Sequence, residues 1–265
     1  MTHVPRRLST PPFERSLLDW WADDYDHVFI ALNPFFRVPG FSPETAAYGP
    51  MHFDREDLSP EEAVDTPPQR PNEAPEDFEL LIKDSGTPVT WAEVQDKLGV
   101  RDREKFRRTV WLWTLESDRA DCDGMIAGGL DQLAARGLYR PEEDIMPVIM
   151  EPQIHRFLTA LGIEEVTLWN EWRDEQMTCP TECFARGEGP VTLPQSRVAA
   201  ISCDSPRLLM AWTHDGVEGF ICMSDEARRA CPPESVFEGD YAGVATYPDW
   251  LNPPGFFDRV QPVFN

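Results

Sequence analysis

The sequence predicts an α+β fold, with a helical N-terminal half packed with a mostly antiparallel sheet in the C-terminal half. Between residues 90 and 136, apolar side chains recur at helical spacing, and capping or stop residues bound each stretch. Between residues 197 and 223, runs of strand-forming residues alternate with turn-forming residues, which is typical of an antiparallel meander. Because helices mostly precede strands, α+β is favoured over a doubly wound sheet. We therefore divide the chain into a mainly helical part, 1–149, and an α+β part, 150–265.

The N-terminal part begins with one short helix and one buried strand. Residues Phe13–Trp21 have the spacing of a short amphipathic helix, and His27–Leu32 is a nearly continuous apolar run that ends at Asn33-Pro34. Nine prolines lie between Asn33 and Pro75, a density that disfavours helix interiors and central strands. We therefore predict a long, Pro-rich, acidic loop over residues 33–79.

Three helices are predicted to follow this loop. Thr90–Leu98 has a capping box formed by Thr90 and Glu93, and Gly99 is its C-terminal stop. Asp102 can cap a second helix that runs to about Ser117. A third helix is predicted over 124–136, because its apolar residues recur at helical spacing before a glycine.

The α+β part opens with a helix that Glu151-Pro152 begins and Gly162 ends. Val166–Trp169 is a predicted strand, residues 173–196 are a predicted loop, and the tail after Gly239 is expected to be irregular.

The antiparallel meander is the strongest structural prediction in the second half. Its three strands are expected at Arg197–Ser202, Leu208–Thr213 and Gly219–Met223. Asp215-Gly216 indicates a tight turn between the last two, and Ser224 is placed to cap a short helix after them. We expect Trp212 and Phe220 to be buried and to face the same layer as Ile201.

The charge is strongly acidic, with 24 Lys and Arg against 47 Asp and Glu and a net charge of −23. Nucleic acid and anionic membrane surfaces are therefore disfavoured as partners, whereas a basic protein suits this field. No apolar run approaches the roughly 20 residues that span a membrane. The N-terminus lacks the apolar segment of a secretory signal, so we expect a cytoplasmic protein.

Metal and cofactor motifs are weak. Cys179 and Cys183 form a C-x3-C pair, but Cys203 and Cys222 are isolated in predicted strands, so a four-thiolate zinc site is disfavoured. The five histidines show no metal-ligand spacing, and no phosphate-binding glycine motif occurs. We expect reduced thiols, no bound metal and no cofactor.

The acidic residues raise the question of an enzyme. Adjacent carboxylates such as Glu142-Glu143-Asp144 occur repeatedly, but general acid–base or metal chemistry needs carboxylates that converge in space, which sequence neighbours do not demonstrate. No catalytic residue is therefore assigned. A carboxylate- or metal-dependent hydrolase of unknown substrate remains the alternative to a binding protein, and an intracellular scaffold is a third class.

The segment Asp54–Glu79 is unusual as a whole, because it carries ten acidic residues and two arginines on a proline-stiffened chain. It is interpreted either as a solvated loop or as an anionic recognition surface. For the second case, the candidate partner-binding residues are Asp54, Glu56, Asp57, Glu61, Glu62, Asp65, Glu73, Glu76 and Asp77.

Two regions resemble an uncharacterised bacterial family associated with toxin neighbourhoods. The first is HVFIALNPFFRVPGF (27–41), followed by TPVTWAEV (87–94). The second is LLMAWTHDGVEGFICMS (208–224), followed by FEGDYA (237–242), a pattern that resembles those of small bacterial immunity proteins. In size, acidity and lack of motifs, the chain is similar to the cytoplasmic proteins that neutralise antibacterial effectors of type VI secretion systems. The resemblance implies function by binding alone, without catalytic residues.

An inhibitor of this kind fits the charge. A toxin that acts on nucleic acid has a basic cleft and works in the cytoplasm, so an acidic cytoplasmic protein suits it as an antidote. We therefore expect an immunity protein that binds a cognate basic toxin, with a nuclease effector favoured, and that occludes the toxin's active-site cleft.

Overall fold

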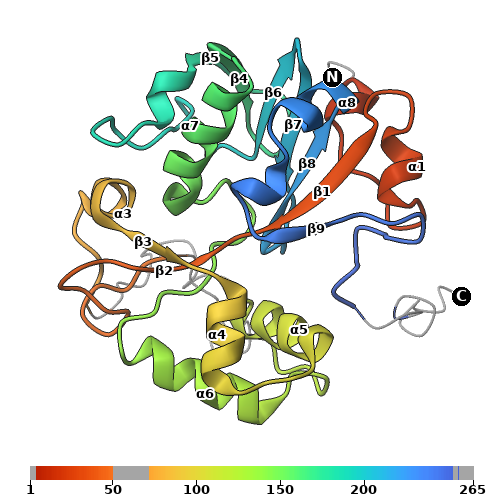
Figure 1. The fold of residues 1–265 in the computed structure, drawn as a ribbon. Helices are drawn as coiled ribbons and strands as arrows, with labels where there is room; N and C mark the ends of the chain where they lie inside the picture. The colour runs from red at the N-terminus through yellow and green to blue at the C-terminus, as the bar shows by residue number, and fades with distance from the viewer. Residues whose placement is uncertain (1–3, 50–71, 253–255, 257–265) are drawn as a thin grey trace, which may run out of the picture.

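A seven-stranded antiparallel sheet is the centre of the computed structural model, which describes residues 4–49, 72–252 and 256 (Figure 1). The strand order is β5-β4-β6-β7-β8-β1-β9, and every neighbouring pair is antiparallel. The strands are β1 (His27–Leu32), β4 (Glu165–Trp169), β5 (Gln176–Pro180), β6 (Ala200–Asp204), β7 (Arg207–Trp212), β8 (Glu218–Met223) and β9 (Gly239–Tyr241). The α+β class and the antiparallel meander are therefore confirmed.

The prediction of a simple helical N-terminal half is wrong. Strand β1 lies inside the sheet, between β8 and β9, so the sheet joins strands from both sides of residue 150. Its near-continuous apolar sequence fits this place, because five of its six residues are buried. The division of the chain into the parts 1–149 and 150–265 stays a prediction.

The predicted loop 33–79 also contains regular structure. Strand β2 (Phe35–Arg37) pairs with β3 (Thr87–Val89), and helix α3 (Phe78–Ser85) begins at the end of the predicted loop. Two further strands lie where irregular chain was predicted, namely β5 and β9, and both are at the edges of the sheet. Edge strands are held by one neighbour only, which explains why their own sequences carry little strand signal.

The helices lie on both sides of the sheet and at one end of it (Figure 1). They are α1 (Leu17–Trp21), α3, α4 (Trp91–Leu98), α5 (Arg103–Thr114), α6 (Gly124–Ala134), α7 (Glu151–Ala160) and α8 (Asp225–Ala230). Short 3-10 turns are η1 (Arg6–Leu8), η2 (Val148–Met150), η3 (Thr181–Phe184) and η4 (Pro233–Ser235). In the part of the chain that the structure describes, no helix is long and apolar enough to cross a bilayer.

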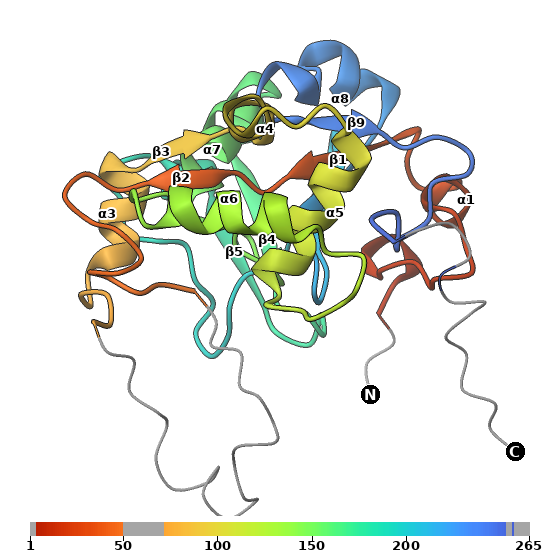
Figure 2. The same ribbon diagram turned by 90° about the horizontal axis from the view of Figure 1, so that it is seen from below.

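Three groups of buried side chains form the core. One face of the sheet packs on α3, α7 and α8, and the opposite face packs on α1. Helices α4, α5 and α6 enclose a third group that reaches the end of β1 at Leu32, and Figure 2 shows them from below beside β1 and β2. The sheet is thus covered on both faces, and its functional surfaces are expected at its ends.

The capping signals of the helices are confirmed. Thr90 and Glu93 form the capping box of α4, and Gly99 takes the left-handed conformation at its end with φ 68°. Asp102 caps α5 and Ser224 caps α8 through its side-chain oxygen, as predicted, whereas Asp123, which was not predicted as a cap, caps α6. These short-range signals fix where the helices begin.

The meander has the predicted strands, but Phe220 does not lie on the predicted face of the sheet. Trp212 and Ile201 are buried in the core group on one face, whereas Phe220 is buried on the other face against Trp21. The turn pairs Trp212 with Gly219, so Phe220 is opposite Ala211. Because directly opposite residues share a face of the sheet, Phe220 cannot share the face of Trp212.

Candidate functional site

Two hollows lie near one end of the sheet, where several strands finish together. Strands β1, β4 and β7 run in the same direction, since each is two antiparallel steps from the next. Their C-terminal ends therefore lie at the same end of the sheet, where the β4–β5 turn and the β7–β8 turn also lie. We call the hollows the acidic pocket and the aromatic pocket.

The acidic pocket has a volume of about 770 Å³. Its acidic lining residues are Glu73, Glu76, Glu79, Glu142, Glu143 and Asp144. Arg197 is its one basic lining residue among those the structure describes, and it is ion-paired with Glu79. The described lining of the hollow therefore holds more acidic than basic side chains.

A buried hydrogen-bond network forms the floor of the acidic pocket. The Tyr48 hydroxyl lies 2.9 Å from Glu142 Oε1 and 3.3 Å from Glu79 Oε1, and the Val148 backbone N–H donates to Glu142 Oε2 at 3.1 Å. Burial raises the pKa of Glu142 to about 7, although its hydrogen bonds and Arg197 act in the opposite direction. A hydroxyl has one proton to give, so protonated Glu142 can donate to Tyr48 while Tyr48 donates to Glu79.

Replacing Glu142 by Gln should change how stability depends on pH. The native pKa is raised above that of the unfolded chain, so the contribution of Glu142 is fully present below about pH 4.5 and is lost as pH rises through about 7. That loss amounts to roughly 3 kcal/mol, at about 1.4 kcal/mol for each unit of pKa shift. Glu142→Gln should therefore gain stability relative to the parent between pH 5 and 8, measured by urea unfolding.

Glu76→Gln is the matched control, since this carboxylate is exposed. Its stability should follow the parent at every pH. Parallel curves for the parent and Glu142→Gln would contradict the inferred protonation of Glu142.

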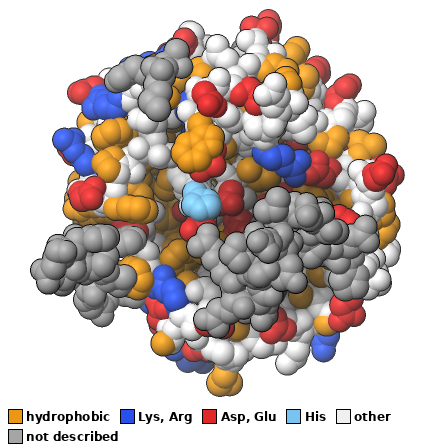
Figure 3. Space-filling view, turned by 180° about the vertical axis from the view of Figure 1, so that it is seen from behind, with side chains coloured by type: hydrophobic (Ala, Val, Ile, Leu, Met, Phe, Trp, Pro, Cys, Tyr) orange, Lys and Arg blue, Asp and Glu red, His pale blue; other side chains and the backbone are white. Residues whose placement is uncertain are grey.

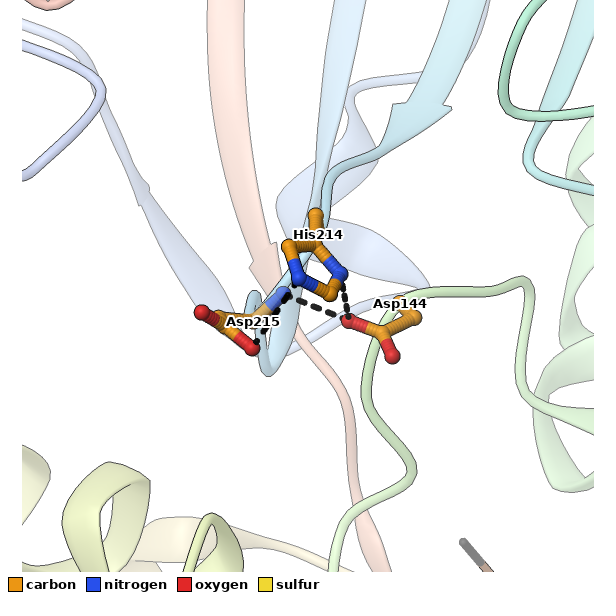
Figure 4. Close-up of side chains that lie close together, drawn as sticks. All are labelled: Asp144, His214 and Asp215. Atoms are coloured by element: carbon orange, nitrogen blue, oxygen red, sulfur yellow. Dashed lines mark hydrogen bonds and ion pairs between the residues drawn. The ribbon is translucent and has the colours of Figure 1, made fainter. Parts of the chain in front are cut away.

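A cluster of Asp144, His214 and Asp215 lies at the rim between the two pockets. Asp144 lines the acidic pocket, and His214 and Asp215 line the aromatic pocket. Figure 4 shows the imidazole between the two carboxylates, with Nδ1 3.3 Å from Asp144 Oδ1 and Nε2 3.6 Å from Asp215 Oδ1. One ligand atom from each residue lies within 4.8 Å of the others, a spacing that suits a divalent cation.

The backbone gives this cluster a structural role as well. The N–H of Asp215 donates to Asp144 Oδ1, and the N–H of Asp144 donates to the Gly216 carbonyl at 3.1 Å. Asp144 and Asp215 both have left-handed backbones, with φ 69° and 56°, which the short Asp side chain tolerates through local hydrogen bonds. The contacts thus fasten the β7–β8 turn to the loop before η2.

The aromatic pocket lies on the other side of this rim and has a volume of about 580 Å³. Phe13, Trp111, Trp172, Trp212 and Phe256 contribute its aromatic rings. Its charged and titratable lining residues are Arg119, Glu171, Arg173, His214, Asp215, Glu218 and Asp249. Burial raises the pKa of Glu218 to about 7, while Trp250 Nε1 donates to its carboxyl group at 3.2 Å. Figure 3 shows a histidine among acidic and hydrophobic side chains on the face turned away from the viewer in Figure 1.

Asn33 joins the two pockets, a role that the sequence did not indicate. This buried amide accepts from Trp212 Nε1 at 3.0 Å and donates to the Glu142 carbonyl at 2.7 Å. Its own carbonyl accepts from Trp91 Nε1 at 2.7 Å. In the sequence Asn33-Pro34 indicated only the end of a strand, because its three partners are 58 to 179 residues away.

Only part of the predicted partner-binding segment can be placed. Glu73, Glu76 and Asp77 are exposed, and the first two line the acidic pocket. The other six candidates, Asp54, Glu56, Asp57, Glu61, Glu62 and Asp65, lie outside the described residues. The sequence missed Tyr48, Arg197 and the convergence of Glu142 and Glu79, which are up to 118 residues apart along the chain.

The four cysteines considered as zinc ligands lie in two places. Cys179 is buried on the face of the sheet that carries α7, with Cys183 beside it, whereas Cys222 is buried on the opposite face. The sheet separates these thiols, so the arrangement does not bring all four to one ion.

The sequence matches the family model described as "Protein of unknown function (DUF2711)" over residues 14–252. No curated protein and no solved structure matched the chain. The matched residues include every strand of the sheet and both sides of the acidic pocket. The chain therefore belongs to the DUF2711 family.

Proposed function

We propose that this protein is an immunity protein that binds and neutralises a basic antibacterial toxin in the cytoplasm. A nuclease effector, whose active-site cleft is basic, is the favoured partner. The observation that carries the proposal is the acidic pocket, in which six carboxylates converge around one already paired arginine, bordered by exposed acidic side chains.

The electrostatics of this pocket favour a cation from outside. Burial raises the pKa of both Glu142 and Glu143, to about 7 and about 8, and the charge of Asp144 adds to the effect on Glu143. A Lys or Arg side chain from a partner would lower both pKa values again, because an opposite charge nearby favours the ionised carboxylate. Binding should then release protons, and the affinity should rise between pH 6 and 8.

The geometry also connects the pocket with the acidic segment of the sequence. The Ala47 N–H donates to the Asn72 carbonyl at 2.8 Å, and the Ala74 N–H donates to the Ala47 carbonyl at 3.1 Å. Residues 49 and 73, on either side of 50–71, both line the pocket. The chain on both sides of residues 50–71 therefore lies at the pocket, which supports a partner-binding surface there that includes Glu73 and Glu76.

The test begins with the partner. Affinity purification of the tagged full chain from its native host should recover a basic protein, and co-expression should abolish that protein's toxicity. Reversing the three exposed acids Glu73, Glu76 and Asp77 to Lys should slow association tenfold or more at about 50 mM salt, since electrostatic steering is lost. The difference should shrink at about 300 mM salt, where charges are screened.

A second variant replaces acidic residues of the segment Asp54–Glu79 by Lys, and it should also associate tenfold or more slowly at about 50 mM salt. The residues replaced are Asp54, Glu56, Asp57, Glu61 and Glu62. The matched control reverses three exposed acids away from the pocket, Asp96, Glu164 and Glu165, and should associate more nearly as the parent does. If the pocket and control variants are slowed equally, the contact is not at the pocket.

The alternative function is a hydrolase. The Asp144, His214 and Asp215 cluster beside the acidic pocket favours it, because these side chains could hold a divalent cation there. Turnover of a nucleotide, ester or peptide substrate by the purified protein with Mn²⁺, lost in Asp144→Asn, would overturn the inhibitor proposal.

A further inference from the structure

The aromatic pocket holds an arginine whose charge no acidic side chain contacts. Arg173 is 8% exposed, and within the described residues no carboxylate oxygen lies within 4.0 Å of its guanidinium group. Its Nε donates to the Leu8 carbonyl at 3.1 Å, and its Nη1 donates to the carbonyls of Asn170 and Glu171. These bonds fix the plane of the guanidinium but leave Nη2 without a hydrogen-bond partner there.

Two features of Arg173 are energetically unfavourable, namely its buried charge and its left-handed backbone. Burial lowers the pKa of Arg173 to about 10, which expresses the cost of removing its charge from water. Its backbone has φ 57°, a left-handed conformation that is uncommon for a long side chain. Such strain is concentrated at binding and catalytic sites, and Arg173 lies in the β4–β5 turn and lines the pocket.

Aromatic side chains surround the remaining space. Trp212 is fully buried, while Trp172 and Phe13 are 72% and 57% exposed, so rings lie both inside the pocket and at its solvent side. A volume of about 580 Å³ lies within the range of roughly 300–1,000 Å³ that small-molecule sites occupy. A few polar groups among mostly apolar walls are the usual composition of such a site.

Glu171, His214, Asp215 and Asp249 also line the pocket, and of the remaining charged lining residues, Arg119 and Glu218 are engaged elsewhere. Arg119 donates to Asp121 and Asn252, and it lies over the Trp111 ring at 5.2 Å. Glu218 accepts from Trp250 Nε1 and from the backbone N–H of Val217. Of the two lining arginines, Arg173 is therefore the one that keeps a guanidinium nitrogen without a hydrogen-bond partner among the described residues.

From this arrangement we infer that the aromatic pocket binds a small planar organic acid. Its carboxylate accepts hydrogen bonds from Arg173 Nη2, and its ring packs among Trp172, Trp212 and Phe13. Arginine suits this task, because its planar donors match a carboxylate and are already oriented by the three carbonyls. The inference does not rest on the proposed function, since this pocket is separate from the acidic one.

Three probes of nearly equal shape test the inference by isothermal titration calorimetry with the full chain. They are naphthalene-2-carboxylate, the neutral naphthalene-2-carboxamide and the cationic 2-naphthylmethylammonium. The carboxylate should bind at least tenfold more tightly than the amide, and the ammonium more weakly than both. Arg173→Gln should reduce the affinity for the carboxylate to that for the amide while leaving the amide unchanged.

Arg186→Gln is the matched control, because Arg186 also donates to backbone carbonyls, those of Asp84 and Gly86, but does not line the pocket. It should leave all three affinities unchanged. If Arg173→Gln fails to fold, Trp172→Ala replaces it, and this exposed substitution should weaken every probe at an unchanged unfolding midpoint. Equal affinities for the carboxylate and the amide in the parent, tighter binding of the ammonium, or no binding at millimolar concentration would overturn the inference.

Discussion

Lys83→Met should destabilise the protein by about 3–5 kcal/mol, the cost typical of removing one partner from a buried ion pair. Lys83 and Glu151 are both fully buried, with Lys83 Nζ 2.7 Å from Glu151 Oε2. The same ammonium donates to the carbonyls of Cys183 and Gly189 at 2.7 Å. Methionine leaves two carbonyls without their donor and a carboxylate without its counter-charge. Urea unfolding at pH 7 measures the loss.

A second change distinguishes the lost charge pair from lost packing. Burial already raises the pKa of Glu151 in the parent, against the effect of Lys83, so this carboxylate is costly once it is alone. Glu151→Gln in the Lys83→Met background should therefore recover part of the stability, because no buried charge remains. Lys97→Met, on the exposed surface of α4, should change stability by less than about 0.5 kcal/mol. A Lys83→Met variant as stable as the Lys97→Met control would show that the pair is not a structural element.

This pair also illustrates what the sequence could not predict. Lys83 lies on the buried side of α3, where a charged residue interrupts the apolar pattern, and its partners are 68 to 106 residues away. Helix α4 is the opposite case, since Thr90, Glu93 and Gly99 are neighbours in the sequence and form its cap and its stop. The helix caps, which neighbouring residues form, were predicted, whereas the ion pair and the hydrogen bonds between distant residues were not.

The candidate sites follow the same division. The acidic segment was evident from composition, but the pocket beside it depends on Tyr48, Glu79, Glu142 and Arg197, which only the fold brings together. No local pattern distinguishes Arg173 from the other arginines either. Its importance lies in its burial and its left-handed backbone, and both are consequences of the completed sheet.

Trp212→Ala should also cost about 3–5 kcal/mol, as the truncation of a large buried aromatic side chain typically does. Trp212 is 1% exposed, and its indole N–H donates to Asn33 Oδ1 at 3.0 Å. Alanine removes the ring from the core and leaves the buried Asn33 oxygen without its donor. Trp212→Phe should cost less, since it keeps most of the apolar volume and loses the hydrogen bond. Trp172→Ala, at an exposed position of the same pocket, should leave the urea midpoint unchanged.

A substitution at Gly219 tests whether the stability lost in Trp212→Ala comes from the position of the indole ring. Trp212 and Gly219 are paired across β7 and β8, and a Cβ atom added at Gly219 would lie 2.8 Å from Trp212 Cε2. Gly219→Ala should therefore destabilise the parent, because the indole must shift. In the Trp212→Ala background the same change should be neutral or stabilising, since the space is open and alanine costs less backbone entropy than glycine. A double-mutant cycle measures this coupling, and additive effects would show that the ring does not lie over Gly219.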